Sequence, residues 1–132
     1  MNDPRARTLA VLGGGTAALA GALTGLFLLR EASDIDLDVL AWLGWAVGPF
    51  ALFVLLAWIA RRSAAAGGVV LVGVLACAAF GAWAIHDAFQ PPREALAGLV
   101  FLVLPLYQGA ALGACAAGVG VILWRSRARG PR

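Results

Sequence analysis

The chain has 132 residues, of which 62% are hydrophobic and 13% are charged, and its mean hydropathy is +0.89. Soluble globular chains are nearer half apolar, so this composition excludes an ordinary water-soluble domain. The formal net charge is +3, but the ten basic residues, all arginine, are scattered over tails and short connections. This distribution argues against a nucleic-acid-binding surface, which needs a basic stripe.

Four long stretches of the chain carry no charged side chain. Each reaches or exceeds the roughly 20 apolar residues that cross a bilayer core about 30 Å thick. We therefore predict an all-α membrane protein, a four-transmembrane-helix bundle that runs up-down-up-down within a single integral-membrane domain, residues 1–132. The predicted spans, the third of which ends on His86, are residues 8–29, 39–60, 64–86 and 95–124.

The first predicted span is longer than the roughly 7–15 apolar residues at the centre of a cleaved signal peptide. Charges follow it at Arg30 and Glu31, where a cleavage site requires small residues, so we expect a retained helix. Small residues recur at every fourth position, which keeps them on one face and allows another helix to approach closely. This predicted packing face consists of Gly13, Ala17, Gly21 and Gly25.

The connection before the second span carries three alternating carboxylates, Asp34, Asp36 and Asp38. We expect them to be solvated and to cap the next helix. Weak divalent-cation binding is the alternative, although the glycine and the bidentate glutamate of a calcium loop are missing. Within the second span, Gly44 and Gly48 form a GxxxG pair that predicts helix packing, and the proline that follows predicts a kink.

The link between the second and third spans is only three residues long, Arg61–Ser63, which predicts that these helices are antiparallel neighbours. The third span carries a small-residue face of its own, made of Gly73, Cys77 and Gly81. We expect His86 to be an ordinary polar helix end, with metal binding or pH sensing as the alternative. We predict no metal site and no disulfide.

The fourth predicted span is about 30 residues long, so we expect it to tilt, to bend at Pro105 or to project beyond the lipid. Its small residues Gly109, Gly113 and Ala117 predict a further packing face. The pattern leaves open whether this and the other small-residue faces form contacts within one chain or between chains.

The most polar point inside a span is the segment with Pro105, Tyr107 and Gln108. Proline removes one backbone hydrogen bond, and the hydroxyl and amide lie within a turn of that break. This segment is a candidate gate, hinge or small ligand site. The simpler interpretation is that Gln108 forms a hydrogen bond with a neighbouring helix, which contributes about 1 kcal/mol.

Arginine asymmetry predicts the orientation of the chain. The two tails and the second connection carry eight arginines, whereas the first and third connections carry one each, together with six carboxylates. Both termini are therefore expected in the cytoplasm. Arginine without lysine, together with abundant Ala and Gly, is typical of a GC-rich bacterial genome. We thus predict a multi-pass protein of a bacterial inner (plasma) membrane, with tryptophans at both interfaces.

No span contains an ionisable residue apart from the terminal His86, which disfavours proton-coupled transport. The sequence has no catalytic, cofactor-binding or phosphate-binding motif, so we predict no enzymatic activity and no cofactor. We expect a structural or accessory component whose partners are the lipid bilayer and either further copies of itself or a larger membrane protein. The alternative is a small oligomeric channel or facilitator for a small solute.

Overall fold

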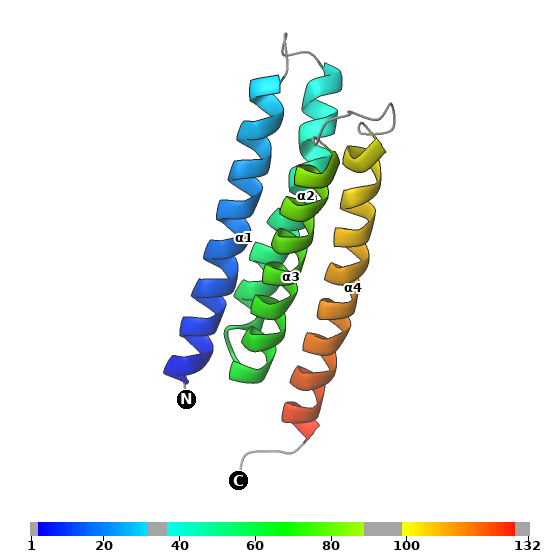
Figure 1. Cartoon of the computed structure of the whole chain (residues 1–132). Coiled ribbons are helices and arrows are strands. Elements are labelled where there is room, and N and C mark those ends of the chain that lie inside the picture. Colours follow the sequence, from blue (N-terminus) through cyan, green and yellow to red (C-terminus); the bar gives the residue numbers. More distant parts are fainter. Residues whose placement is uncertain (1–2, 32–36, 89–98, 129–132) are drawn as a thin grey trace.

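The computed structural model describes residues 3–31, 37–88 and 99–128. These residues form four helices, α1 (Pro4–Glu31), α2 (Leu37–Ala60), α3 (Ala64–Ala88) and α4 (Leu99–Ala128), which pack side by side (Figure 1). All four are long and apolar enough to cross a membrane. The described structure is therefore all-helical, and the prediction of four membrane-length helices is confirmed.

The start of α1 has a local cause that the apolar pattern does not reveal. The helix begins at Pro4, four residues before the predicted span, because Asp3 caps it: its Oδ1 accepts the Arg5 backbone N–H at 2.9 Å. Proline suits the first helical position, since its missing N–H has no partner there. At the other predicted boundaries, residues 95–98 and the candidate caps Asp34 and Asp36 lie outside the described residues.

Ser63 closes the tight turn between α2 and α3 and also opens α3. Its backbone N–H donates to the Ala60 carbonyl oxygen at 3.0 Å, and its own carbonyl oxygen accepts the Gly67 N–H at 2.9 Å. The Ser63 hydroxyl oxygen accepts the Ala66 N–H at 3.4 Å, as an N-cap does. At the start of α2, Asp38 lies in the first turn, where a carboxylate favours the helix dipole.

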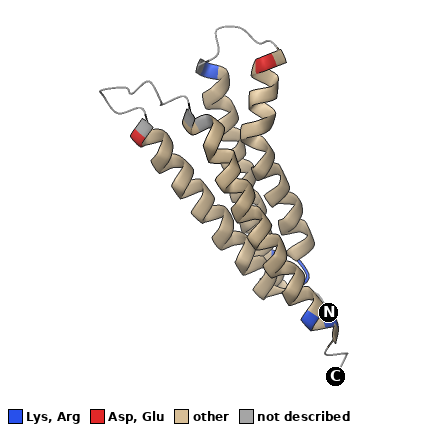
Figure 2. Cartoon of the chain, turned by 90° about the vertical axis from the view of Figure 1, so that its right-hand side faces the viewer, with Lys and Arg blue, Asp and Glu red and all other residues tan. Residues whose placement is uncertain are grey.

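The helices are arranged so that α2 and α3 both separate α1 from α4. Helix α1 contacts α2 and α3, and α4 contacts the same two, whereas the described residues of α1 and α4 make no contact with each other. The start of α1 and the end of α4 lie at one end of the bundle, here called the terminal end (Figure 1). The helices lie close together there and spread apart toward the opposite end (Figure 2).

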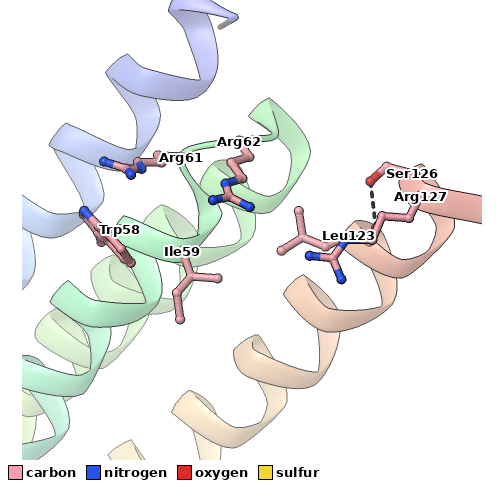
Figure 3. Close-up of a pocket in the computed structure, with 7 residues that line it drawn as sticks. All are labelled: Trp58, Ile59, Arg61, Arg62, Leu123, Ser126 and Arg127. Carbon is pink, nitrogen blue, oxygen red and sulfur yellow. Dashed lines mark hydrogen bonds between the residues drawn. The ribbon is translucent and has the colours of Figure 1, made fainter. Parts of the chain in front are cut away.

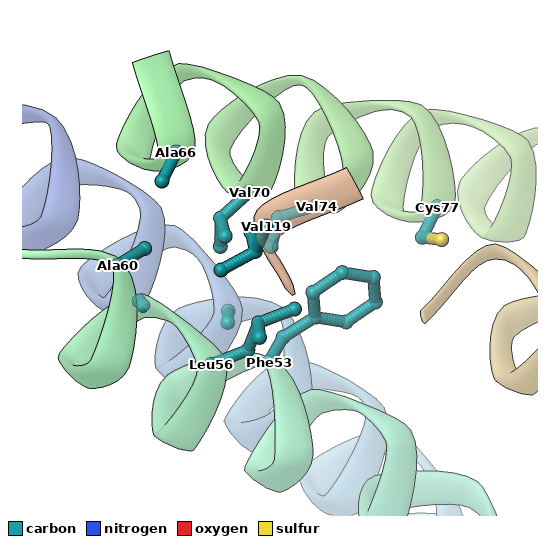
Figure 4. Packing of buried hydrophobic residues seen from close by; sticks show 10 residues of the cluster. Phe53, Leu56, Ala60, Ala66, Val70, Val74, Cys77 and Val119 are labelled. Atoms are coloured by element: carbon teal, nitrogen blue, oxygen red, sulfur yellow. The ribbon is translucent and has the colours of Figure 1, made fainter. Parts of the chain in front are cut away.

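The core lies in the half of the bundle nearer the terminal end. Its largest fully buried side chains are Phe53 of α2, Val70 and Val74 of α3, and Val119 of α4, which meet in Figure 4. Alanines around them keep the helix axes close. In lipid, dispersion between such closely packed atoms holds helices together, because hydrocarbon offers no water to exclude. The core therefore depends on shape more than on apolar character.

The outer surface of the bundle is also apolar. Large hydrophobic side chains are exposed on all four helices, among them Val11, Leu55, Val72 and Trp124. In water such a continuous surface would drive aggregation, whereas in a bilayer acyl chains cover it. The burial pattern thus agrees with helices that lie in lipid.

Candidate functional site

The predicted small-residue face of α1 lies against the two neighbouring helices. Gly13, Ala17, Gly21 and Gly25 are all buried. A Cβ placed on Gly13 would lie 3.5 Å from the backbone nitrogen of Leu71 on α3. A Cβ on Gly21 would lie 3.1 Å from the Cβ of Phe50 on α2. Within one chain, this face is where α1 approaches both α2 and α3.

On α3, two of the predicted positions face α4. A Cβ on Gly73 would overlap Cys115, and one on Gly81 would lie 3.4 Å from Nε2 of Gln108. The closest approach to α1 is at Gly67, where a Cβ would lie 3.1 Å from that of Leu9. The predicted packing faces do not include Gly67, although the adjacent glycines 67 and 68 at the start of the third span are a signal in the sequence.

The predicted small-residue pairs of α2 and α4 have no such neighbours. Around Gly44, Gly48, Gly109 and Gly113, no heavy atom of another described residue would lie within 4 Å of an added Cβ, apart from the chain neighbours and the helix's own backbone. On α4, Gly109, Gly113 and Ala117 are exposed. These three residues are here called the α4 ridge. They face away from the other described helices of the same chain.

A cavity of about 570 Å³ lies in the half of the bundle where the helices spread apart. All four helices line it, with Thr24 on α1, Phe50 on α2, Gly81 on α3, and Pro105 and Gln108 on α4. The size falls in the range of about 300–1,000 Å³ that is usual for small-molecule pockets. Because most of the lining is apolar, the few polar groups decide what the cavity can hold.

Gln108 supplies the most deeply placed of these polar groups. Its side chain is only 3% exposed, yet it lines the cavity beside Gly81. Among the described residues, the amide forms no hydrogen bond with another group, while the Thr24 hydroxyl donates to the Ala20 carbonyl oxygen at 2.9 Å. A primary amide has two donor hydrogens and an acceptor oxygen. His86, near the end of α3, also lines the cavity, so the polar groups of the lining are an amide, a hydroxyl and an imidazole, all of which form hydrogen bonds.

The three residues of the predicted polar intramembrane site do not stay together. Pro105 and Gln108 line the cavity, whereas Tyr107 is 62% exposed and packs edge-on against Phe80, with ring centroids 6.1 Å apart. Residues 107 and 108 are separated by about 100° on a helix, which directs their side chains to different faces. The Trp45 indole N–H adds a link between α2 and α4 by donating to the Leu102 carbonyl oxygen at 3.3 Å.

The part of the chain that the structure describes contains no cluster of metal-ligating side chains. No three or more His, Cys, Asp or Glu side chains gather there in a way that would hold an ion. Cys77 and Cys115 are free thiols on facing helices.

The chain matches no family model, no curated protein and no solved structure. The features of the described residues that can support a function are the cavity, the α4 ridge and the charged ends of the bundle.

Proposed function

We propose that the chain is a multi-pass protein of a bacterial inner membrane that runs up-down-up-down with both termini in the cytoplasm. The terminal end carries Arg5 and Arg7 of α1, the Arg61–Arg62 turn and the arginines at the end of α4, while the opposite end carries Asp38, Asp87 and a single described arginine, Arg30 (Figure 2). Short arginine-rich flanks remain in the cytoplasm, which supports this orientation.

Reporter fusions test the proposed sidedness. A green fluorescent protein fused after residue 132 should fluoresce, and alkaline phosphatase at the same position should be inactive, because the first folds in the cytoplasm and the second needs the periplasm. A fusion of each reporter to the 32–36 connection should give the reverse pattern. Active phosphatase at the C-terminus would contradict the proposal.

We infer that the protein is a non-enzymatic accessory component that associates with a second copy of itself through the α4 ridge. The observation that carries this inference is the exposure of Gly109 and Gly113, which have no neighbour within 4 Å of an added Cβ. In lipid, exposed Gly and Ala gain little from acyl chains and much from a helix backbone that packs directly against them. Such a ridge favours a partner helix.

A second copy is the partner that best suits this ridge. A two-fold interface is self-complementary, so it would place Gly109 and Gly113 of one chain against the same residues of the other without a separate matching surface. Helix α4 is also available, since it contacts only α2 and α3 and has the smallest buried share of the four membrane-length helices. The other class of partner is a larger membrane protein with a matching helix. A complex that contains this chain and a different protein would identify that class.

Gly113→Leu is expected to weaken dimerisation at least tenfold without affecting the fold of one chain. The leucine enters open space within the chain, and leucine favours a helix more than glycine does. At the proposed interface it would separate the two backbones. Native mass spectrometry over a dilution series in mild detergent measures the monomer–dimer equilibrium.

The matched control for this substitution is Ala114→Leu, at an exposed position about 100° around the same helix. This variant should dimerise like the wild type. A wild-type chain that is monomeric at all concentrations, or equal effects of the two substitutions, would rule out the α4 ridge as the interface.

A second candidate function, a facilitator for a small neutral solute, is favoured by one observation: the Gln108 amide borders an apolar cavity of about 570 Å³. A single chain offers this solute no continuous path, because fully buried Phe53, Val70, Val74 and Val119 fill the bundle nearer the terminal end. Passage would then require separation of those helices or a path between chains. Solute flux into liposomes, and its dependence on Gln108, tests this candidate.

A further inference from the structure

A second cavity, of about 330 Å³, lies at the terminal end between the end of α2 and the end of α4. Figure 3 shows Arg62, from the turn after α2, and Arg127, from α4, extending toward the same space. The residues that line this cavity, here called the arginine pocket, are Trp58, Ile59, Arg61, Arg62, Leu123, Ser126 and Arg127.

The charges of the arginine pocket are all positive. Three of its seven lining residues are arginines and none is acidic. Among the described residues, none of the three guanidinium groups forms an ion pair with a carboxylate. Asp3, the one described acidic residue at the terminal end, caps α1 instead. Like charges close together repel one another, so an anion between them would be stabilised.

Arg61 is held in place by a tryptophan ring. Its guanidinium carbon lies 4.4 Å from the centroid of the Trp58 ring, a cation–π contact (Figure 3). Stacking on the face of the ring leaves the N–H groups at the edge of the guanidinium free to donate. Arginine donors suit a phosphate because they form paired, planar hydrogen bonds with its oxygens.

The remaining wall of the arginine pocket is apolar. Ile59 is 42% exposed and lies opposite Leu123 in Figure 3. The Ser126 hydroxyl donates to the Leu123 carbonyl oxygen at 2.8 Å, so it does not donate into the pocket. The pocket thus combines cationic donors with aliphatic side chains on the side nearer the middle of the spans. An anionic phospholipid has the matching arrangement, with its phosphate at the membrane surface and its acyl chains extending toward the middle of the bilayer.

We propose that the arginine pocket binds a phosphate group, namely the phosphodiester of an anionic phospholipid whose acyl chains extend along Ile59 and Leu123. Arg62, from the turn after α2, and Arg127, from α4, contact the phosphate oxygens, and Arg61 contributes from its position over Trp58. A bound lipid would join the ends of the two helices. The proposal requires only that the helices span a bilayer, and it is independent of dimerisation and of solute passage.

The test compares two arginines on the same helix. Full-length protein in phosphatidylcholine nanodiscs is titrated with palmitoyl-oleoyl phosphatidylglycerol, and native mass spectrometry counts the lipids bound per chain. Arg127→Gln should weaken binding of the first phosphatidylglycerol about tenfold, the usual effect of losing one hydrogen bond to a charged group. Arg125→Gln, which removes the same charge from a residue outside the pocket, should change it less than twofold.

Two further measurements separate a lipid headgroup from soluble phosphate and a folding defect from a binding defect. If inorganic phosphate in lipid-free detergent binds with the same dependence on Arg127, the pocket takes phosphate but not specifically a lipid. Circular dichroism should show equal helix content for wild type, Arg125→Gln and Arg127→Gln, since both side chains are exposed.

Equal weakening by Arg125→Gln and Arg127→Gln would overturn the proposal, because it would mean that the arginines attract anionic lipid only as a general positive surface. Equal binding of phosphatidylglycerol and phosphatidylcholine would overturn it as well. Arg62→Lys adds a check on geometry: it keeps the charge but loses the planar pair of donors, so it should weaken binding more than Arg125→Lys.

Discussion

Gly13→Leu is expected to lower the free energy of unfolding of the bundle by about 2–3 kcal/mol, the usual cost of overpacking a well-filled core. The atoms nearest an added Cβ are the backbone nitrogen of Leu71 at 3.5 Å, and the Cα of Leu71 and Cγ1 of Val70, both at 3.6 Å. A single methyl group fits at that distance, so Gly13→Ala should be close to neutral. The three further carbons of leucine have no space unless α1 moves away from α3.

The matched control is Gly15→Leu, two positions along α1, where an added Cβ has no neighbour within 4 Å. There the leucine faces outward, and its better helix propensity should leave stability equal or slightly higher. Unfolding in mixed micelles with increasing SDS, followed by circular dichroism, measures both variants. Similar destabilisation by Gly13→Leu and Gly15→Leu would show that α1 does not pack on α3 through this face.

Gln108→Leu is the substitution expected to have the largest effect on transport if the protein facilitates passage of a neutral solute. Leucine has a similar volume but no hydrogen-bonding group, and the Gln108 side chain is almost fully buried beside the cavity. The loss of one hydrogen bond to a solute corresponds to about a fivefold change in its occupancy. Stopped-flow light scattering of proteoliposomes measures flux over a panel of neutral solutes and ions.

Tyr107→Phe is the control for this experiment, because it removes a hydroxyl from the exposed neighbour of Gln108 outside the cavity. A second pair of variants tests the volume of the cavity. Ala78→Phe places a ring in the cavity, whereas the control Ala79→Phe places it on the outer surface of the same helix. Flux should fall in Gln108→Leu and Ala78→Phe alone. Wild-type proteoliposomes no more permeable than empty ones would eliminate the facilitator as a function.

Similar residue patterns have different surroundings in this bundle. The spacing of Gly13, Ala17, Gly21 and Gly25 resembles that of Gly109 and Gly113, yet the first set is buried between helices and the second is exposed. Spacing by four identifies the residues that share a helix face. It does not identify the direction of that face, because the direction depends on where the other three helices lie.

The cavity could not be predicted for the same reason. Pro105 and Gln108 were recognisable as unusual residues in an apolar span, but Thr24, Phe50 and Gly81 are unremarkable in the sequence. They border one space because the helices spread apart toward the end opposite the termini. Tyr107 and Gln108 are adjacent in the sequence, but the helical twist directs their side chains to different faces.

The number, length and apolar character of the helices can be predicted from the sequence, because each of these properties depends on residues that are close together in the chain. An uncharged run of sufficient length is suited to lipid whatever its neighbours do. The packing of the four helices determines which glycines lie between helices, which remain exposed, and that arginines from α4 and from the turn after α2 line one pocket. Those features depend on contacts between distant segments, which are set by how four helices fit together in space.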